Sequence, residues 1–284
     1  MPESTPVTVA VVQFAPVIAD PAANRVRSAE LITAAVDDGA DLIVLPEASN
    51  AGYVFTDHDE AFAYAEEVPD GPACRAWGEL CARYGVYIVA GVTERAGTTV
   101  YNSAVLIGPD GHIGTYRKCH LWNDEKLLFA PGDLGFPVYE TPLGRIAMTI
   151  CYDEWFPETF RLCALGGADI VCVPANWVPV PGQPPGLPTM ANMMTMTGAH
   201  SNLVYVAAAS RVGTERGQAF IGTSLIVDHT GWPLAGPADG TSERVLLAGC
   251  DLTGSRAARH DNPFNQPLRD RRLDLYGETP RPAP

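Results

Sequence analysis

The chain contains 284 residues, of which 46% are hydrophobic, and it carries a formal net charge of -14. A chain of this length and apolar content can bury a large core without disulfide bonds. The negative charge argues against nucleic acid or an anionic membrane surface as a partner, because both require a basic face. The seven cysteines show no CxxC spacing, which favours a reducing compartment over a disulfide framework.

The N-terminal segment has no basic stretch ahead of its first apolar run, so we expect no secretory signal peptide. No apolar run approaches the roughly 20 residues that a membrane-spanning helix needs. The composition therefore predicts a soluble, cytoplasmic protein with neither nucleic acid nor membrane as a partner.

Strand and helix patterns alternate along the first half of the chain. Apolar runs predict the strands, whereas helical spacing of apolar residues that ends at a glycine predicts the helices. The predicted elements are a strand at 7–16, a helix at 24–40, a strand at 41–46, a helix at 74–85, a strand at 86–92 and a hairpin at 99–118 that turns at 109–111.

The second half continues the alternation. Its predicted elements are a strand at 145–153, a helix at 156–167, a strand at 169–174, a strand at 202–210 and a strand pair at 222–235 that turns at 229–231. The proline-rich stretch 178–188 is predicted to be a loop. Such alternation is typical of the α/β class, in which helices cover the sheets. No linker interrupts the pattern, so we expect a single domain over residues 1–284.

Two segments, 39–46 and 167–174, share a Gly-Ala-Asp start, an apolar strand and a closing proline. They are either halves of an internal duplication or two instances of the common connection in which a glycine ends a helix and an aspartate precedes the next strand. Under both interpretations the residues that follow, Glu47 and Ala175, lie beyond the carboxyl ends of strands, where α/β proteins bind ligands. A carboxylate at the end of a buried strand needs a partner, because its desolvation is otherwise strongly unfavourable.

Three other side chains indicate a chemical role for Glu47. Cys151 follows a strand just before a helix, Lys118 follows a hairpin strand, and Glu125 comes seven residues later. Taken singly, each is ordinary: such a cysteine is commonly a small buried hydrophobe, and the charged residues are commonly solvated. Together they supply the thiol, base and cation that nucleophilic attack on a carbonyl requires.

At this point the sequence resembles the nitrilase superfamily of carbon–nitrogen hydrolases, from about Val7 to Tyr276. The stretches that carry the resemblance are "LIVLPE", "YRKCHLW", "EKLLFAPGD", "ICYDEWFPE", "NLVYVAAASRVG", "GTSLIVDHTG" and "RDRRLDLYGE". The family's Glu–Lys–Cys triad falls on Glu47, Lys118 and Cys151, and its supporting glutamate on Glu125. The resemblance implies a four-layer α-β-β-α sandwich, a homodimer or higher homo-oligomer, and catalysis without a metal or cofactor.

The resemblance also implies the reaction. The thiol of Cys151 attacks a small linear amide or N-carbamoyl compound, and ammonia leaves as a thioester acyl-enzyme forms. The stretch "CYDEWFPE" looks like the amidase and carbamoylase pattern, since nitrilases usually carry Trp-Glu after the nucleophile. Nitrile hydrolysis and acyl transfer to an amine remain alternatives.

Position predicts further contacts for the substrate. They are Tyr53, Tyr152, Trp155, Asn176 and Trp177. Four methionines at 190, 193, 194 and 196 replace a Trp and an Arg that many relatives carry, and they form core packing, an adaptable pocket or a dimer contact. Arg161 and Glu158 are spaced for an ion pair that braces the cysteine turn, or for an ordinary solvated pair.

Two other classes of function compete with this one. A metal site could use Cys119, His120, Cys151 and Asp153, but the spacing is not that of known zinc motifs. A binding protein without activity is disfavoured, because the whole set of reactive side chains is present.

Overall fold

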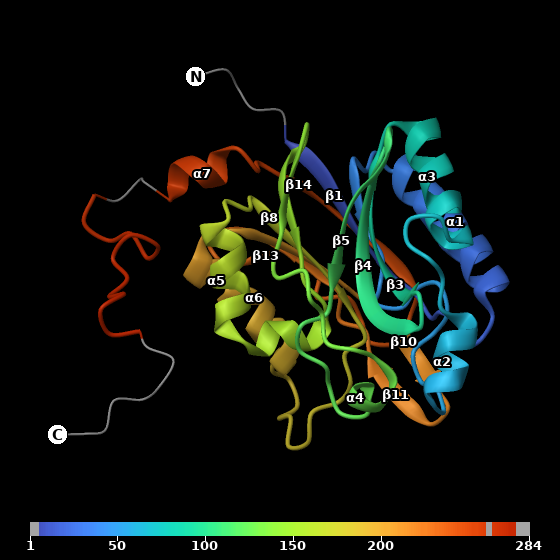
Figure 1. The fold of residues 1–284 in the computed structure, drawn as a ribbon. Coiled ribbons are helices and arrows are strands. Elements are labelled where there is room, and N and C mark those ends of the chain that lie inside the picture. Colours follow the sequence, from blue (N-terminus) through green and yellow to red (C-terminus); the bar gives the residue numbers. More distant parts are fainter. Residues whose placement is uncertain (1–5, 260–262, 277–284) are drawn as a thin grey trace.

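The computed structural model describes residues 6–259 and 263–276, and within them the chain forms two stacked six-stranded sheets flanked by helices (Figure 1). The first sheet has the order β14 (Arg244–Cys250), β1 (Val7–Gln13), β2 (Leu42–Val44), β3 (Tyr87–Ala96), β4 (Thr99–Gly108), β5 (Gly111–Arg117). The second has the order β13 (Pro233–Ala235), β12 (Leu225–Val227), β9 (Tyr205–Ser210), β8 (Ile170–Ala175), β7 (Gly144–Met148), β6 (Val138–Thr141).

Parallel pairing joins the central strands of each sheet, and antiparallel pairing joins the outer ones. Strands β1, β2 and β3 run parallel, as do β7, β8 and β9. A separate hairpin pairs β10 (Val212–Glu215) with β11 (Gln218–Ile221). The helical elements are α1 (Pro21–Asp37), α2 (His58–Tyr64), α3 (Pro72–Tyr84), α4 (Glu125–Leu128), the 3-10 turn η1 (Cys151–Trp155), α5 (Pro157–Leu165), α6 (Met190–Asn202) and α7 (Gly254–Ala258).

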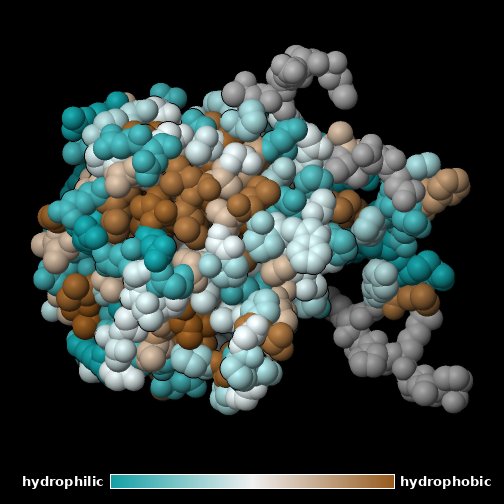
Figure 2. Space-filling model, turned by 180° about the vertical axis from the view of Figure 1, so that it is seen from behind, coloured by the Kyte–Doolittle hydropathy of each residue, from teal (hydrophilic) through white to brown (hydrophobic). Residues whose placement is uncertain are grey.

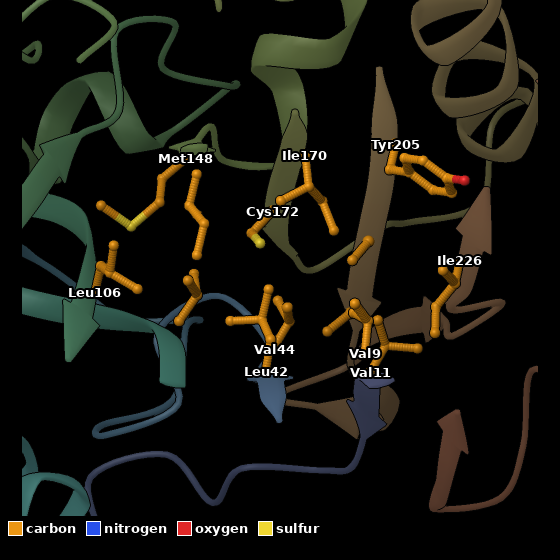
Figure 3. Packing of buried hydrophobic residues seen from close by; sticks show 14 of the residues in the cluster. Val9, Val11, Leu42, Val44, Leu106, Met148, Ile170, Cys172, Tyr205 and Ile226 are labelled. Atoms are coloured by element: carbon orange, nitrogen blue, oxygen red, sulfur yellow. The ribbon is translucent and has the colours of Figure 1, made fainter. Parts of the chain in front are cut away.

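Alternating side chains explain why the central strands read as unbroken apolar runs. On β1, Val9 and Val11 point to the opposite sheet, whereas Ala10 and Val12 pack beneath α1 and α3. On β8 the residues at 170 and 172 lie between the sheets, and those at 171 and 173 face α5 and α6. Figure 3 shows the inner set meeting from both sheets. The predicted four-layer α-β-β-α sandwich is thereby confirmed.

Local signals set several element ends as predicted. The helix α3 begins at Pro72 and stops at Gly85, which takes the left-handed conformation with φ of 73°. The hairpin of β4 and β5 turns at Pro109 and Asp110, as expected. The stretch 178–188 contains no regular element, in agreement with the predicted loop.

Several predicted strands extend beyond the observed ones, and two of these differences involve a helical element. Asn202 ends the helix α6, and the strand β9 begins only at Tyr205. The strand at 145–153 stops at Met148, and Cys151 begins the turn η1. In both cases the apolar pattern of the strand extends into residues whose backbone belongs to a helix or a turn. Gly277 and Glu278 of the last family-like stretch lie outside the described residues.

Hydrophilic and hydrophobic areas are both present on the face drawn in Figure 2. Figure 2 shows a face that is largely hydrophilic, with one contiguous area of hydrophobic residues near its centre. Within the described residues, no helix is long and apolar enough to cross a lipid bilayer.

Candidate active site

The fold brings together four side chains that are far apart in the sequence. Glu47 follows β2, Lys118 follows β5, Glu125 begins α4 and Cys151 begins η1. Lys118 Nζ donates to Glu47 Oε1 at 2.7 Å and to Glu125 Oε1 at 2.8 Å. The side chains of Lys118 and Glu47 are fully buried, and that of Glu125 is 3% exposed. The predicted grouping is therefore present as a buried cation between two carboxyl groups.

Asn102 on β4 is a further member of this group that sequence reasoning missed. Its Nδ2 donates to Glu47 Oε1 at 2.7 Å and to Glu125 Oε1 at 3.0 Å. Tyr53 completes the arrangement, since its hydroxyl donates to Glu125 Oε1 at 2.9 Å. The sequence carries no signal for Asn102, because an asparagine between Tyr101 and Ser103 on a hairpin strand is ordinary until its burial is known.

Burial and charge give the acidic groups unusual proton affinities. Burial raises the pKa of Glu47 to about 7, with the cation of Lys118 opposing and the charge of Glu125 adding to the rise. Among the residues that the structure describes, its Oε2 has no hydrogen-bond partner. Glu47 is consequently poised to gain or lose a proton near neutral pH.

The cation and the thiol respond to the same surroundings. Burial disfavours the charged form of Lys118, but the carboxylates of Glu125 and Glu47 outweigh it and raise its pKa. Burial and the charge of Glu47 raise the pKa of the Cys151 thiol well above its usual value, although Lys118 lowers it. Lys118 therefore stays positively charged, and Cys151 holds its proton until a base removes it.

The turn η1 holds Cys151 in a strained conformation. Cys151 has φ of 47°, in the left-handed region that residues with a side chain rarely adopt. Asp153, fully buried, stabilises the turn because its Oδ2 accepts from the Ile150 backbone N–H at 2.9 Å and from the Tyr116 hydroxyl at 2.7 Å. Its Oδ1 accepts from the backbone N–H of His120 at 3.1 Å. The same carboxyl group thus ties the Cys151 turn to the segment that carries Lys118.

This arrangement accounts for the residues of the competing metal hypothesis. The His120 ring places Nδ1 2.7 Å from Asp153 Oδ1, and it stacks on Phe156 with 3.7 Å between ring centroids. Within the described part of the chain, no group of three or more His, Cys, Asp or Glu side chains could hold a metal ion.

Close packing of two backbones places Glu47. A Cβ atom on Gly91 of β3 would lie 2.5 Å from Pro46 O and 2.7 Å from Ala48 N, and it would also meet the Cα of Glu47. Two backbone hydrogen bonds fix the contact, from Gly91 N–H to Pro46 O and from Ser49 N–H to Gly91 O. Glycine is required here because the loop after β2 lies directly on β3.

A cavity of about 240 Å³ opens beside Cys151, and we call it the Cys151 cavity. Its walls are mostly aromatic and aliphatic. The lining residues are Tyr53, Trp122, Cys151, Tyr152, Trp155, Asn176, Trp177, Val178, Pro179, Val180 and Pro181. All five residues predicted to contact substrate lie in this lining, and the predicted loop supplies the wall from Val178 to Pro181.

Two of these wall residues are fixed by polar contacts behind them. Asn176 Nδ2 donates to the backbone carbonyl oxygen of Glu47 at 3.2 Å. The indole Nε1 of Trp177 donates to Glu154 Oε2 at 3.1 Å. Asn176 therefore connects the two strand ends that follow the repeated Gly-Ala-Asp segments, and Glu154 is a second buried carboxyl group that the sequence did not indicate.

The ion pair predicted for Arg161 is absent among the described residues, and Met196 of α6 follows the core-packing interpretation. Arg161 donates from Nη2 to the Ser201 backbone oxygen at 2.9 Å, and within the described residues it forms no ion pair with Glu158. The four methionines of α6 are absent from the lining of the Cys151 cavity. Met196 instead packs against the core beneath α5 and α6.

Comparison with known proteins agrees with the fold. The family described as carbon-nitrogen hydrolase matches residues 8–260. The chain belongs to this family, and it is a hydrolase of carbon–nitrogen bonds. It is 42% identical to a protein named nitrilase from Pyrococcus abyssi, over 95% of this chain and 99% of that one.

Two further comparisons are informative. The chain is 36% identical to an N-carbamoylputrescine amidase from Solanum lycopersicum, over 95% of this chain and 93% of the relative. A crystal structure of a carbon–nitrogen hydrolase from Helicobacter pylori superposes with a TM-score of 0.84 at 28% identity, over 95% of this chain and 96% of that one.

We expect Gly91→Ala to lower the free energy of unfolding by about 1–3 kcal/mol, because the new methyl group overlaps the backbone that carries Glu47. Displacement of Glu47 should also reduce turnover. Gly78→Ala in α3 is the matched control, since its Cβ would meet only Ile107 Cγ2 at 3.8 Å. The control should be neutral or stabilising by about 0.5–1 kcal/mol. Equal stability of both variants in chemical denaturation would contradict this account of Glu47 placement.

Proposed function

We propose that this protein hydrolyses the C–N bond of small linear amides or N-carbamoyl compounds through a thioester on Cys151, with release of ammonia. The observation that carries the proposal is the buried contact of Lys118 with Glu47 and Glu125, beside a cysteine on a strained turn. An arrangement of this kind supplies a nucleophile, a base and a cation within one dry site.

In the first step Glu47 removes the proton from the Cys151 thiol. The oxygen Oε2 of Glu47 is suited to receive it, because it has no other hydrogen-bond partner. The sulfur then forms a bond to the substrate carbonyl carbon, and the carbonyl oxygen becomes an anion. The ammonium group of Lys118 and the backbone N–H of Tyr152 stabilise this oxyanion.

Collapse of the tetrahedral intermediate breaks the C–N bond. Glu47 returns its proton to the departing nitrogen, so that neutral ammonia leaves and a thioester remains on Cys151. Glu47 then accepts a proton from water, and the resulting hydroxide attacks the thioester carbon. The C–S bond breaks, the acid product departs, and the sulfur regains a proton.

Glu125 has a different part in this scheme. Its Oε1 accepts from Lys118, Asn102 and Tyr53, and its Oε2 accepts from the Trp122 backbone N–H at 2.6 Å. With four donors around it, Glu125 is suited to hold Lys118 in place rather than to exchange protons.

The Cys151 cavity favours a small substrate with an uncharged body. Its walls include Tyr152, Trp155 and Trp177, and they surround a volume of about 240 Å³. The Tyr-Asp pair after Cys151 and the similarity to an N-carbamoylputrescine amidase support an amide or carbamoyl group at the sulfur. The similarity to a protein named nitrilase supports nitriles as the alternative substrate, and an amine in place of water would give acyl transfer.

A screen for ammonia release over amides, N-carbamoyl compounds and nitriles tests the proposal. We expect turnover of an amide or carbamoyl compound, and complete loss of turnover in Cys151→Ala with the far-ultraviolet circular dichroism unchanged. Cys74→Ala is the control, because this cysteine lies in the core beneath α3 and should leave the reaction intact. Turnover by Cys151→Ala at the wild-type rate would refute the mechanism, and release from nitriles alone would refute the substrate class.

The pH dependence follows from the raised pKa of Glu47, about 7. Below this value the carboxyl group is protonated and cannot accept the thiol proton, so kcat/KM should rise as the pH increases through about 7. The apparent pKa belongs to the coupled group of Glu47, Cys151 and Lys118. A profile that stays flat between about pH 5 and 7 would exclude Glu47 as the base.

We also propose that the chain forms a homo-oligomer. Leu162 and Leu165 of α5 are 47% and 46% exposed, and Figure 2 shows a contiguous hydrophobic area on one face of the molecule. Exposed apolar areas are typical of interfaces. Light scattering after gel filtration should give at least twice the mass of one chain, and less in a Leu162→Lys, Leu165→Lys variant. A monomeric wild type at micromolar concentration would contradict the proposal.

A further inference from the structure

Glu154 is a buried carboxyl group that the proposed reaction leaves unused. It lies on η1 three residues after Cys151 and is 3% exposed. Its Oε2 accepts from Trp177 Nε1 at 3.1 Å, and its Oε1 lies 2.7 Å from Thr195 Oγ1 on α6. Both partners are uncharged, and a buried carboxylate with uncharged partners alone is strongly unfavourable.

The hydrogen count at Thr195 points to the neutral form of Glu154. Thr195 Oγ1 lies 3.0 Å from the backbone oxygen of Ala191 and 2.7 Å from Glu154 Oε1. A hydroxyl group has one hydrogen to donate, and the Ala191 carbonyl can only accept. If Thr195 donates to Ala191, the hydrogen between Thr195 and Glu154 must come from Glu154.

A protonated carboxyl group satisfies every contact at once. Its Oε1–H donates to Thr195 Oγ1, while its Oε2 accepts from the indole of Trp177, which is a donor only. An ionised Glu154 would instead require Thr195 to turn its hydrogen away from Ala191. The neutral acid is thus the form in which the contacts of Thr195 to Ala191, of Glu154 to Thr195 and of Trp177 to Glu154 all hold at the same time.

The surroundings of Glu154 favour the same form. Burial raises the pKa of Glu154 to about 8; the hydrogen bonds from Thr195 and Trp177 oppose the rise, and the charge of Asp153 on the same turn adds to it. Neither hydrogen-bond partner that Glu154 has among the described residues carries a positive charge, and His120 contacts Asp153 on the same turn instead. The titratable residues of the elements that pack on η1 are Glu158, Arg161 and Cys163 of α5, His200 of α6, and Cys172 of β8.

The contacts of these titratable residues are with groups other than Glu154. Arg161 donates to the Ser201 oxygen, and His200 Nδ1 lies 2.7 Å from the Thr230 oxygen. Glu158 is exposed, and the two cysteines are buried in apolar clusters.

We propose that Glu154 is kept as a neutral carboxylic acid and positions Trp177, the indole wall of the Cys151 cavity, so that substrate fit depends on it. Trp177 lines the cavity and is 2% exposed, and the Glu154 contact fixes its ring from behind. Glu154 is thus a positioning residue for the reaction, and this assignment rests on the proposed function because it takes the Cys151 cavity as the substrate site.

The ionisation of Glu154 makes the free energy of unfolding depend on pH. Because the pKa of Glu154 is raised on folding, its stabilising contribution is complete below the ordinary carboxyl pKa of about 4.3. It is lost as the pH rises through about 8. In Glu154→Gln the amide N–H can donate to Thr195 and its carbonyl can accept from Trp177, so this variant retains the contacts without ionising.

The experiment compares the full-length wild type with Glu154→Gln and Glu154→Leu. The infrared difference spectrum of wild type minus Glu154→Gln at neutral pH should contain the carbonyl band of a protonated carboxylic acid. The free energy of unfolding of Glu154→Gln relative to wild type should increase between about pH 5 and 8. Glu154→Gln should keep KM within about twofold, whereas Glu154→Leu leaves the Trp177 N–H unpaired and should raise KM roughly tenfold with little change in kcat.

Two results would overturn the proposal. One is a carboxylate band in the difference spectrum at neutral pH, and the other is a KM for Glu154→Gln as high as that of Glu154→Leu. The infrared and unfolding measurements need no substrate, so they decide the state of Glu154 even if Glu154→Leu does not fold. A wild type inactive on every amide would contradict the proposed function and would leave those two measurements intact.

Discussion

The ammonium group of Lys118, buried between the carboxyl groups of Glu47 and Glu125, is the interaction on which the rest of the site depends. A fully buried cation is tolerated only where opposite charge and hydrogen bonds surround it. The fold meets this requirement by ending β2 and β5 at the same place and by adding Asn102 from β4. Both carboxyl groups then acquire a defined position, and Glu47 keeps one oxygen without a partner.

The second sheet supplies the nucleophile, which the first sheet lacks. Cys151 lies on the turn after β7, in a left-handed conformation that Asp153 stabilises through contacts to both chain segments. The two sheets pack face to face (Figures 1 and 3), and the Asp153 contacts to Ile150 and His120 hold this turn beside the segment that carries Lys118. The strain at Cys151 and the close approach at Gly91 are local costs that the surrounding core and hydrogen bonds offset.

The sequence predicted those site residues whose type conflicts with the local pattern of the chain. Glu47 is conspicuous because a charge follows a buried strand, whereas the matching position in the second segment is Ala175. Residues without such a conflict were missed. Asn102 and Glu154 occupy positions at which a solvated side chain would be equally ordinary, and their partners come from distant strands and helices. The apolar pattern predicted no helix over α6, because its polar and apolar residues do not form a distinct stripe.

Rapid-quench peptide mass spectrometry during the first turnover of an amide substrate tests the central claim most directly, since the claim is that a thioester forms on Cys151. The account predicts an acyl group on the peptide that contains Cys151, appearing before the acid product and then decaying. Product formation with an unmodified Cys151 peptide, or with the acyl group on another residue, would contradict it.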